Sequence, residues 1–243
     1  REFELVDPAA AGHLDAFIGE FYHMRKAKGL TEEQARAMML QPIPHGMMML
    51  HKGLGGGLVA GASHSTGDTL RPALQILRTA PGSSIVSAFF FMAMPEADGR
   101  TFIFADSGLV EDPNAEQLAE IALCSARTAL SFGIPPTVAM ISYSTKGSAK
   151  SHLTEKVVEA TRIALERMDS HFKPEEGVVL DGELQVDAAI VEKVGASKAP
   201  GSPVAGKARV LVFPDLNCGN SAYKLVQRLA NAEAYGQIGR AHV

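Results

Sequence analysis

A loop rich in small hydroxyl residues, residues 61–71, has the composition of an anion-binding site. It follows a short apolar run and opens a predicted helix, so helix N–H groups and the hydroxyls of Ser65 and Thr66 can meet an anion. Arg71 can add a bidentate charge from the same helix. The alternative is a turn whose polar groups only cap the helix, with Asp68 as the N-cap. The sequence leaves both interpretations open.

A second loop, residues 142–151, repeats this design after another predicted strand. It contains four serines, one threonine and two lysines ahead of a helix. The residues that could bind a ligand here are Ser144, Thr145, Lys146 and Ser148. The loop lacks the Gly-x-x-x-x-Gly-Lys-Ser/Thr spacing of a P-loop, but its composition still favours a phosphate or another oxyanion as its ligand.

Two glycine-rich segments resemble nucleotide-binding motifs without satisfying them. Residues 201–207 have P-loop glycine and lysine spacing, but Ala208 replaces the Mg-binding hydroxyl and the segment precedes a predicted strand. Gly53-x-Gly55 lacks the third glycine of a dinucleotide fingerprint and also precedes a predicted strand. The sequence therefore predicts neither an NTPase nor a dinucleotide-binding enzyme.

Residues for nucleophilic catalysis or metal binding are not grouped in this sequence. Cys124 lies on an apolar helical stripe and is typical of a core residue. Cys218 lies in a turn between a predicted strand and helix, where a reactive thiol is conceivable, but no base is adjacent in sequence. The two cysteines lack metal-site spacing, so we expect no metal site and no disulfide framework.

Predicted strands and helices alternate along the chain, which is typical of an α/β fold with a largely parallel sheet covered on both faces. In such folds ligands bind outside the carboxyl ends of strands, where both Ser/Thr loops would lie. A weak boundary at 80–83 separates a smaller first portion from a larger second one. The predicted strands are 58–60, 85–93, 101–106, 137–143, 178–180 and 208–213, and the later helices are 114–130, 152–168, 186–194 and 221–234.

Composition excludes several classes of protein. The chain has 243 residues, of which 46% are hydrophobic and 21% charged, with a formal net charge of -4. This balance gives no global field that would favour nucleic acid. The longest apolar stretch, residues 85–94, is about half of what a membrane span requires. We expect a cytoplasmic protein with neither a nucleic-acid nor a membrane partner.

Motifs along nearly the whole chain resemble those of phosphate acetyltransferase (phosphotransacetylase), in that family's order. Its members have two α/β domains, fold like isocitrate and isopropylmalate dehydrogenases, and form homodimers. The resemblance implies a two-domain, three-layer α/β/α protein with an incomplete first domain at 1–80 and a second at 81–236. The motifs are His64-Ser-Thr-Gly-Asp-Thr-Leu-Arg71, Phe104-Ala-Asp-Ser-Gly108, 112–119, Ser142-Tyr-Ser-Thr-Lys-Gly-Ser148, 181–188, 198–206 and Phe213-Pro-Asp-Leu-Asn-Cys-Gly-Asn220.

The family's reaction moves an acetyl group between CoA and inorganic phosphate, with acetyl phosphate as the other substrate. The CoA thiol attacks the carbonyl directly in a ternary complex, which agrees with the missing nucleophile and implies no tightly bound cofactor. Carried over residue by residue, Arg71 is expected at the reacting groups. Arg25 and Arg228 match arginines that bind CoA and phosphate, and the two Ser/Thr loops match substrate-binding loops. Alternatives are phosphate butyryltransferase and the acetyl-CoA-sensing domain fused to some malic enzymes.

The ends of the chain depart from the family pattern. Residue 1 is Arg rather than Met, so we expect the chain to start inside a domain. Residues 237–243 stand where the family continues toward a Ser-Arg motif and an Asp base, and they can be encoded by a common short-read sequencing adapter. We interpret them as an adapter-derived tail on an internal fragment, the alternative being a natural tail. The chain as given is therefore expected to have little transferase activity.

Overall fold

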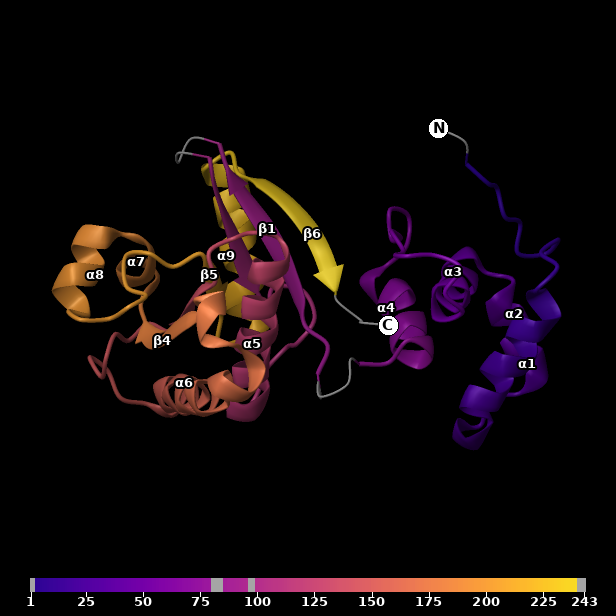
Figure 1. Ribbon diagram of the computed structural model, residues 1–243, viewed down its shortest axis with the longest axis horizontal. Coiled ribbons are helices and arrows are strands. Elements are labelled where there is room, and N and C mark those ends of the chain that lie inside the picture. The colour runs from indigo at the N-terminus through magenta and orange to yellow at the C-terminus, as the bar shows by residue number, and fades with distance from the viewer. Residues whose placement is uncertain (1–2, 80–84, 96–98, 240–243) are drawn as a thin grey trace. The chain divides into compact units, whose positions relative to one another are not determined.

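The computed structural model describes residues 3–79, 85–95 and 99–239, with no side-chain placement for Thr66 or 237–239. These residues divide into two compact units, 3–79 and 85–239. Neither contains, in its described part, a helix long and apolar enough to cross a membrane. Figure 1 labels the elements of both units.

The described residues of the first unit form helices only. These are α1 (Leu14–Arg25), the 3-10 helix Lys26–Lys28, α2 (Glu32–Met39), α3 (Pro42–His51) and α4 (Thr66–Ile76). A capping box of Thr31 and Gln34 opens α2. Buried apolar side chains from all four α-helices form one core, which includes Phe21, Met39, Met48 and Ile76.

Two local predictions for the first unit are wrong. The apolar run 58–60 is not a strand, and Val59 is fully exposed because no described strand of this unit is available to pair with it. Ser65, not Asp68, is the N-cap of α4, so that helix starts three residues earlier than the predicted cap would allow.

The second unit is built around a six-stranded sheet in its described part, with the order β4-β3-β5-β2-β1-β6. The strands are β1 (Ala88–Met94), β2 (Arg100–Ala105), β3 (Thr137–Ile141), β4 (Val179–Leu184), β5 (Val210–Val212) and β6 (Glu233–Gly239). Neighbours from β4 to β2 pair in parallel, whereas β1 pairs antiparallel with both β2 and β6. The sheet is therefore mixed. The loop 142–151 follows β3, at the carboxyl edge of the parallel half.

Side chains alternate between two cores because successive strand residues point to opposite faces. On β2, Ile103 packs with α5 (Ala115–Ser131) and α6 (His152–His171), while Phe102 and Phe104 pack on the other face. That face is covered by α7 (Val186–Ile190), the loop after α8 (Glu192–Lys198), and α9 (Leu216–Leu229) (Figure 1). The second unit thus has the three layers expected of it, and a short 3-10 helix at Pro174–Glu176 precedes β4.

The later elements match most predictions, with three main differences. The predicted helix 186–194 is two helices, α7 and α8, which meet at Val191. The predicted helix 221–234 begins earlier, at Leu216, and ends at Leu229. The chain then forms β6, in which Tyr235 is paired with Phe91 and Ile238 with Phe89. The apolar run of β1 provides the partner that favours an extended chain here.

Residues 237–239 of the proposed tail lie in β6, and 240–243 fall outside the described residues.

Candidate functional site

The first Ser/Thr loop is tied to α4 by its own side chains. The Ser65 hydroxyl accepts a hydrogen bond from the Asp68 amide at 3.2 Å and donates one to the Asp68 carboxylate at 2.7 Å. The Thr69 hydroxyl donates to the Ser65 carbonyl. Ser65 therefore caps the helix with its hydroxyl, in place of the predicted N-cap Asp68.

The charges of this loop are opposite in sign and exposed. The hydroxyl of Ser65 lowers the pKa of Asp68, with a smaller contribution from the positive charge of Arg71. A carboxylate in the first turn of α4 competes with an incoming anion for the positive end of the helix. An anion would thus depend on Arg71, whose guanidinium is solvent-exposed.

Arg71 shares one property with Arg25 and Arg228. Among the described residues, none of these three guanidinium groups has a carboxylate within 4.0 Å, so all three keep their donors for other partners. Arg25 is the last residue of α1 and Arg71 lies on α4, both in the first unit. Arg228 is exposed in the last turn of α9, in the second unit.

The second Ser/Thr loop uses its amides internally. Thr145 N–H donates to the Ser148 hydroxyl at 3.0 Å, and Ala149 N–H donates to the Ser144 hydroxyl at 3.0 Å. Lys146 N–H donates to the Glu183 carbonyl, and Ser148 N–H to the Thr145 carbonyl. Ser144 and Thr145 are buried. A phosphate cradle needs amides that point at its ligand, and the geometry of this loop does not supply them.

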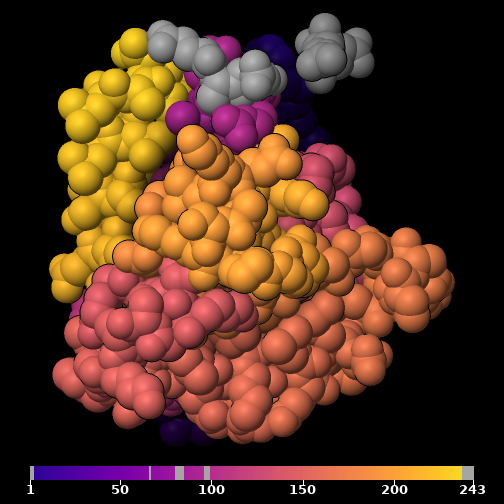
Figure 2. Space-filling view, turned by 90° about the vertical axis from the view of Figure 1, so that its left-hand side faces the viewer, coloured from indigo at the N-terminus to yellow at the C-terminus, as the bar shows by residue number. Residues whose placement is uncertain are grey.

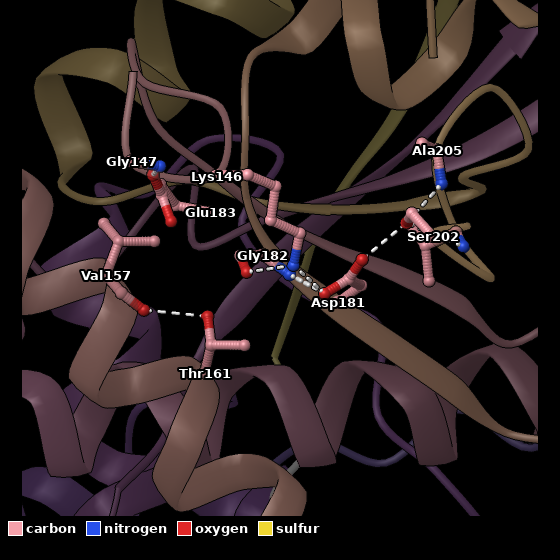
Figure 3. A network of polar contacts seen from close by, with 10 residues as sticks. Lys146, Gly147, Val157, Thr161, Asp181, Gly182, Glu183, Ser202 and Ala205 are labelled. Atoms are coloured by element: carbon pink, nitrogen blue, oxygen red, sulfur yellow. Dashed lines mark hydrogen bonds and ion pairs between the residues drawn. The ribbon is translucent and has the colours of Figure 1, made fainter. Parts of the chain in front are cut away.

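Lys146 lies in a network of polar contacts drawn in Figure 3. It forms an ion pair with Asp181, and its Nζ donates to the Gly182 carbonyl at 2.8 Å. The same carboxylate accepts a hydrogen bond from Ser202, which lies in the segment that imitates a P-loop. Asp181 thus joins two loops that are far apart in sequence, and it neutralises the cation that a phosphate would need.

Glu183 is a residue whose role sequence reasoning missed. Its side chain is 3% exposed, and its Oε1 accepts hydrogen bonds from the Ser144 hydroxyl at 2.9 Å and the Gly147 amide at 2.7 Å. Lys146 and Gly147 both have positive φ, so this tight turn is fixed by Glu183 rather than by backbone preference. The signal available in sequence was two acidic residues, Asp181 and Glu183, directly after the predicted strand 178–180.

A buried carboxylate also fixes the loop after β2. Asp106 accepts hydrogen bonds from the amides of Ala88, Gly108 and Leu109 at 2.7–2.8 Å. Burial raises the pKa of Asp106, although these amide donors act in the opposite direction. All three partners are backbone groups, which indicates a structural role.

A pocket of about 530 Å³ lies where β3, β4 and β5 end. Such a volume falls within the range of about 300–1,000 Å³ common for ligand sites. Figure 2 views the second unit from the side that carries α7 and α8, in orange, with the chain from α9 onward in yellow. The lining residues are Ile141, Ser142, Tyr143, Leu153, Lys156, Gln185, Val186, Asp187, Pro214, Asp215 and Cys218. The carboxyl edge of the parallel strands therefore holds a pocket, at the edge where the α/β pattern predicts ligand binding.

Cys218 lines this pocket without the partners of a nucleophile. Burial raises the pKa of its thiol, and the nearby Asp215 carboxylate acts in the same direction. The thiol is therefore less ionised than usual, whereas a catalytic cysteine needs a lowered pKa. The described residues contain no group of three His, Cys, Asp or Glu side chains that could hold a metal ion.

Comparisons with known proteins agree with one another. A family model described as "Phosphate acetyl/butaryl transferase" matches residues 1–240. The phosphate acetyltransferase of Acetivibrio thermocellus is 54% identical over 238 residues, which are 96% of this chain and 70% of that protein. The phosphate acetyltransferase of Escherichia coli is 47% identical over 235 residues, and this chain spans 31% of its length.

Solved structures show the same relationship. A phosphotransacetylase from Streptococcus pyogenes is 44% identical with a TM-score of 0.88, and the match covers 98% of this chain and 70% of that one. The EutD phosphotransacetylase from Staphylococcus aureus is 43% identical with a TM-score of 0.87 and the same coverage. The chain therefore belongs to the phosphate acetyltransferase and butyryltransferase family.

Proposed function

We propose that this chain carries the acetyl-transfer site of a phosphate acetyltransferase, acting on acetyl-CoA and phosphate to give acetyl phosphate and CoA. The observation that supports it most directly is the family match over residues 1–240, together with relatives at 47–54% identity that are named phosphate acetyltransferase. An acetyl rather than butyryl substrate is proposed because these relatives carry the acetyl name.

The unpaired arginines are proposed to bind the anionic groups of the substrates. A guanidinium offers two parallel donors to a phosphoryl group, and an internal ion pair would remove that capacity. Arg71 is assigned to the reacting phosphate and carbonyl, and Arg25 and Arg228 to CoA and phosphate. On this assignment the three unpaired cations, rather than the amides of loop 142–151, supply the positive charge.

The Ser/Thr loops are assigned supporting roles. Ser65 and Thr66 open α4 near Arg71 in sequence, and Ser65 is assigned to substrate binding through its position at the helix start. In the second loop, the buried Ser144 and Thr145 give the loop its shape, whereas Lys146 and Ser148 are exposed toward solvent. A substrate oxyanion would therefore meet Lys146 and Ser148 first.

The proposed chemistry is direct attack in a ternary complex. The thiol sulfur of CoA forms a bond to the acetyl carbon of acetyl phosphate, the carbon–oxygen bond to phosphate breaks, and the thiol proton leaves to a base. Holding both substrates together lowers the entropic barrier, and guanidinium groups stabilise charge on the leaving phosphate. We assign no residue of this chain as the base. We also propose a homodimer located in the cytoplasm, as the family resemblance implies.

Turnover tests this proposal. Acetyl phosphate formation from acetyl-CoA and phosphate is measured for the 243-residue chain and for the chain continued by the C-terminal segment of the Acetivibrio thermocellus relative. We expect turnover from the continued chain and little from the chain alone, with butyryl-CoA a poorer substrate for the continued chain. Absence of both turnover and CoA binding in the continued chain would contradict the proposed function.

A further inference from the structure

The pocket at the ends of β3, β4 and β5 has walls that are mainly apolar. Ile141, Leu153, Val186 and Pro214 contribute aliphatic surface, and Tyr143 adds an aromatic ring. Leu153 is 50% exposed and Val186 40% exposed, so this surface faces solvent in the described chain. A ligand that covers it would gain about 25 cal/mol for each Å² of apolar area removed from water.

The charged groups of the pocket are already neutralised. Lys156 is paired with Asp112 at 2.7 Å, and Asp187 with Lys198 at 2.8 Å. Asp215 is the N-cap of α9 and accepts a hydrogen bond from the Cys218 amide. No unpaired cation lines the pocket within the described residues, and two carboxylates do. A phosphoryl group would therefore find no free cation among the described residues that line the pocket.

Two neutral side chains that line the pocket, Ser142 and Gln185, keep hydrogen-bonding capacity. Gln185 uses its Oε1 to accept from Thr145 and Lys198, and its Nε2 has no partner among the described residues. The Ser142 oxygen accepts from the Ser144 amide, which leaves its hydroxyl hydrogen as a donor. Donors next to the carboxylate acceptor of Asp215 suit amide groups, which both donate and accept.

We propose that this pocket binds the neutral pantetheine arm of CoA, whose amides meet Gln185 and Ser142 and whose methylene groups cover Leu153 and Val186. This inference rests on the proposed function, because CoA is the substrate that brings such an arm. It divides recognition of CoA into an apolar, amide-bearing part held in the pocket and a phosphate part held elsewhere by unpaired arginines.

Cys218 reports on occupancy because it lines the pocket and the residue as a whole remains accessible to solvent. Alkylation by iodoacetamide at about pH 9 is followed by peptide mass, with Cys124 as the internal reference. Three thiol-free probes are compared: desulfo-CoA, N-ethylpantothenamide and adenosine 3′,5′-bisphosphate. We expect the first two to slow alkylation of Cys218 at least fivefold and the bisphosphate to have no effect. Protection by the bisphosphate alone would overturn the proposal.

A pocket-filling variant gives a second measurement. Val186→Trp should weaken desulfo-CoA binding at least tenfold by calorimetry, whereas Val158→Trp, at an exposed valine of α6 outside the pocket, should leave it unchanged. Equal affinity in Val186→Trp and the unaltered chain overturns the inference while leaving CoA binding, and thus the proposed function, intact. Absence of both turnover and CoA binding in the continued chain contradicts both. Alkylation of Cys218 that accelerates on dilution would instead assign the pocket to a second copy of this chain.

Discussion

The Ser144 hydroxyl donates a hydrogen bond of 2.9 Å to the carboxylate of Glu183, and this bond connects the loop after β3 to the end of β4. The same carboxylate oxygen accepts the Gly147 amide, and the Glu183 carbonyl accepts the Lys146 amide. The side chain and the carbonyl of Glu183 together fix three residues of this turn, which are Ser144, Lys146 and Gly147. The loop that composition assigned to a phosphate is shaped from within by an anion of the chain itself.

Removing this carboxylate should destabilise the second unit. Glu183→Ala leaves the buried Ser144 hydroxyl and the Gly147 amide without their acceptor, and such losses cost about 1–3 kcal/mol per group. We expect the free energy of unfolding, measured with urea, to fall by roughly 2–4 kcal/mol. Glu183→Gln keeps an oxygen acceptor in the same place and should recover most of this loss. Equal destabilisation by both variants would show that charge, not hydrogen bonding, fixes the turn.

Gly182, one residue earlier, is required for a close approach to β3 and α6. A Cβ at this position would lie 2.5 Å from the Met140 Cβ and 2.7 Å from the Thr161 hydroxyl. Gly182→Ala should therefore lower the free energy of unfolding by about 1–3 kcal/mol, as overpacking does.

The matched control is Gly19→Ala in the middle of α1, where a Cβ meets open space. There alanine should raise the free energy of unfolding by about 0.5–1 kcal/mol. Thermal unfolding of both variants distinguishes packing from backbone effects, and a stable Gly182→Ala would refute the steric argument.

The parallel half of the sheet could be predicted because its signals are local. Short apolar runs alternate with amphipathic stripes, and the stripe of α5 begins at the capping box of Asn114 and Gln117. The run 58–60 has the same apolar composition but forms no strand. Strand formation also requires a neighbouring strand to pair with, and the local sequence does not reveal whether one is present. β6 was missed for the converse reason, since its extended conformation depends on the edge of β1.

The sequence predicted which edge of the sheet carries a pocket, but not how the side chains there are bonded. The predicted strand 137–143 put the loop 142–151 at the carboxyl edge of the sheet, where Ser142 and Tyr143 line the pocket. Composition could not show that Lys146 is paired with Asp181, because 35 residues separate them and they meet only in the folded sheet. Whether a cation is free for a ligand is decided by such tertiary pairs. The assignment of the site residues to substrates remains a prediction.

Lowering the pH should decrease the free energy of unfolding of the second unit, in part because Asp187 becomes protonated. The hydrogen bond from the Lys198 ammonium lowers the pKa of this carboxyl. A lowered pKa in the folded state means that the unfolded state binds the proton more tightly. The stabilisation is therefore present above the ordinary pKa of about 3.9 and is lost as pH falls through the folded value. Because the pair is largely exposed, Asp187→Asn should cost less than about 1 kcal/mol at pH 7. The difference from the unaltered chain should shrink as the pH falls below about 3.9. The control is Asp169→Asn, which removes an exposed carboxylate of α6 that has no ion-pair partner among the described residues. Urea unfolding at several pH values measures both, and a difference that grows toward pH 3 would reverse the assigned sign.

The three unpaired arginines make the sharpest prediction for binding. Arg71→Ala removes a guanidinium that no described carboxylate neutralises, and loss of one charged partner of a ligand typically costs about 2–5 kcal/mol. Calorimetric affinity of the chain for phosphate or CoA should therefore fall at least tenfold, and Arg71→Lys should recover only part because an ammonium cannot form the bidentate contact. Arg228→Ala should weaken CoA binding in the same way.

The control is Arg162→Ala on α6, whose guanidinium is held by Glu159 at 2.7 Å and also contacts Glu166. Its donors are occupied by the protein, so its loss should leave both affinities unchanged. If Arg71→Ala binds phosphate and CoA as well as Arg162→Ala does, an unpaired guanidinium in this fold is no mark of a substrate site, and Arg71 must be removed from the proposed mechanism.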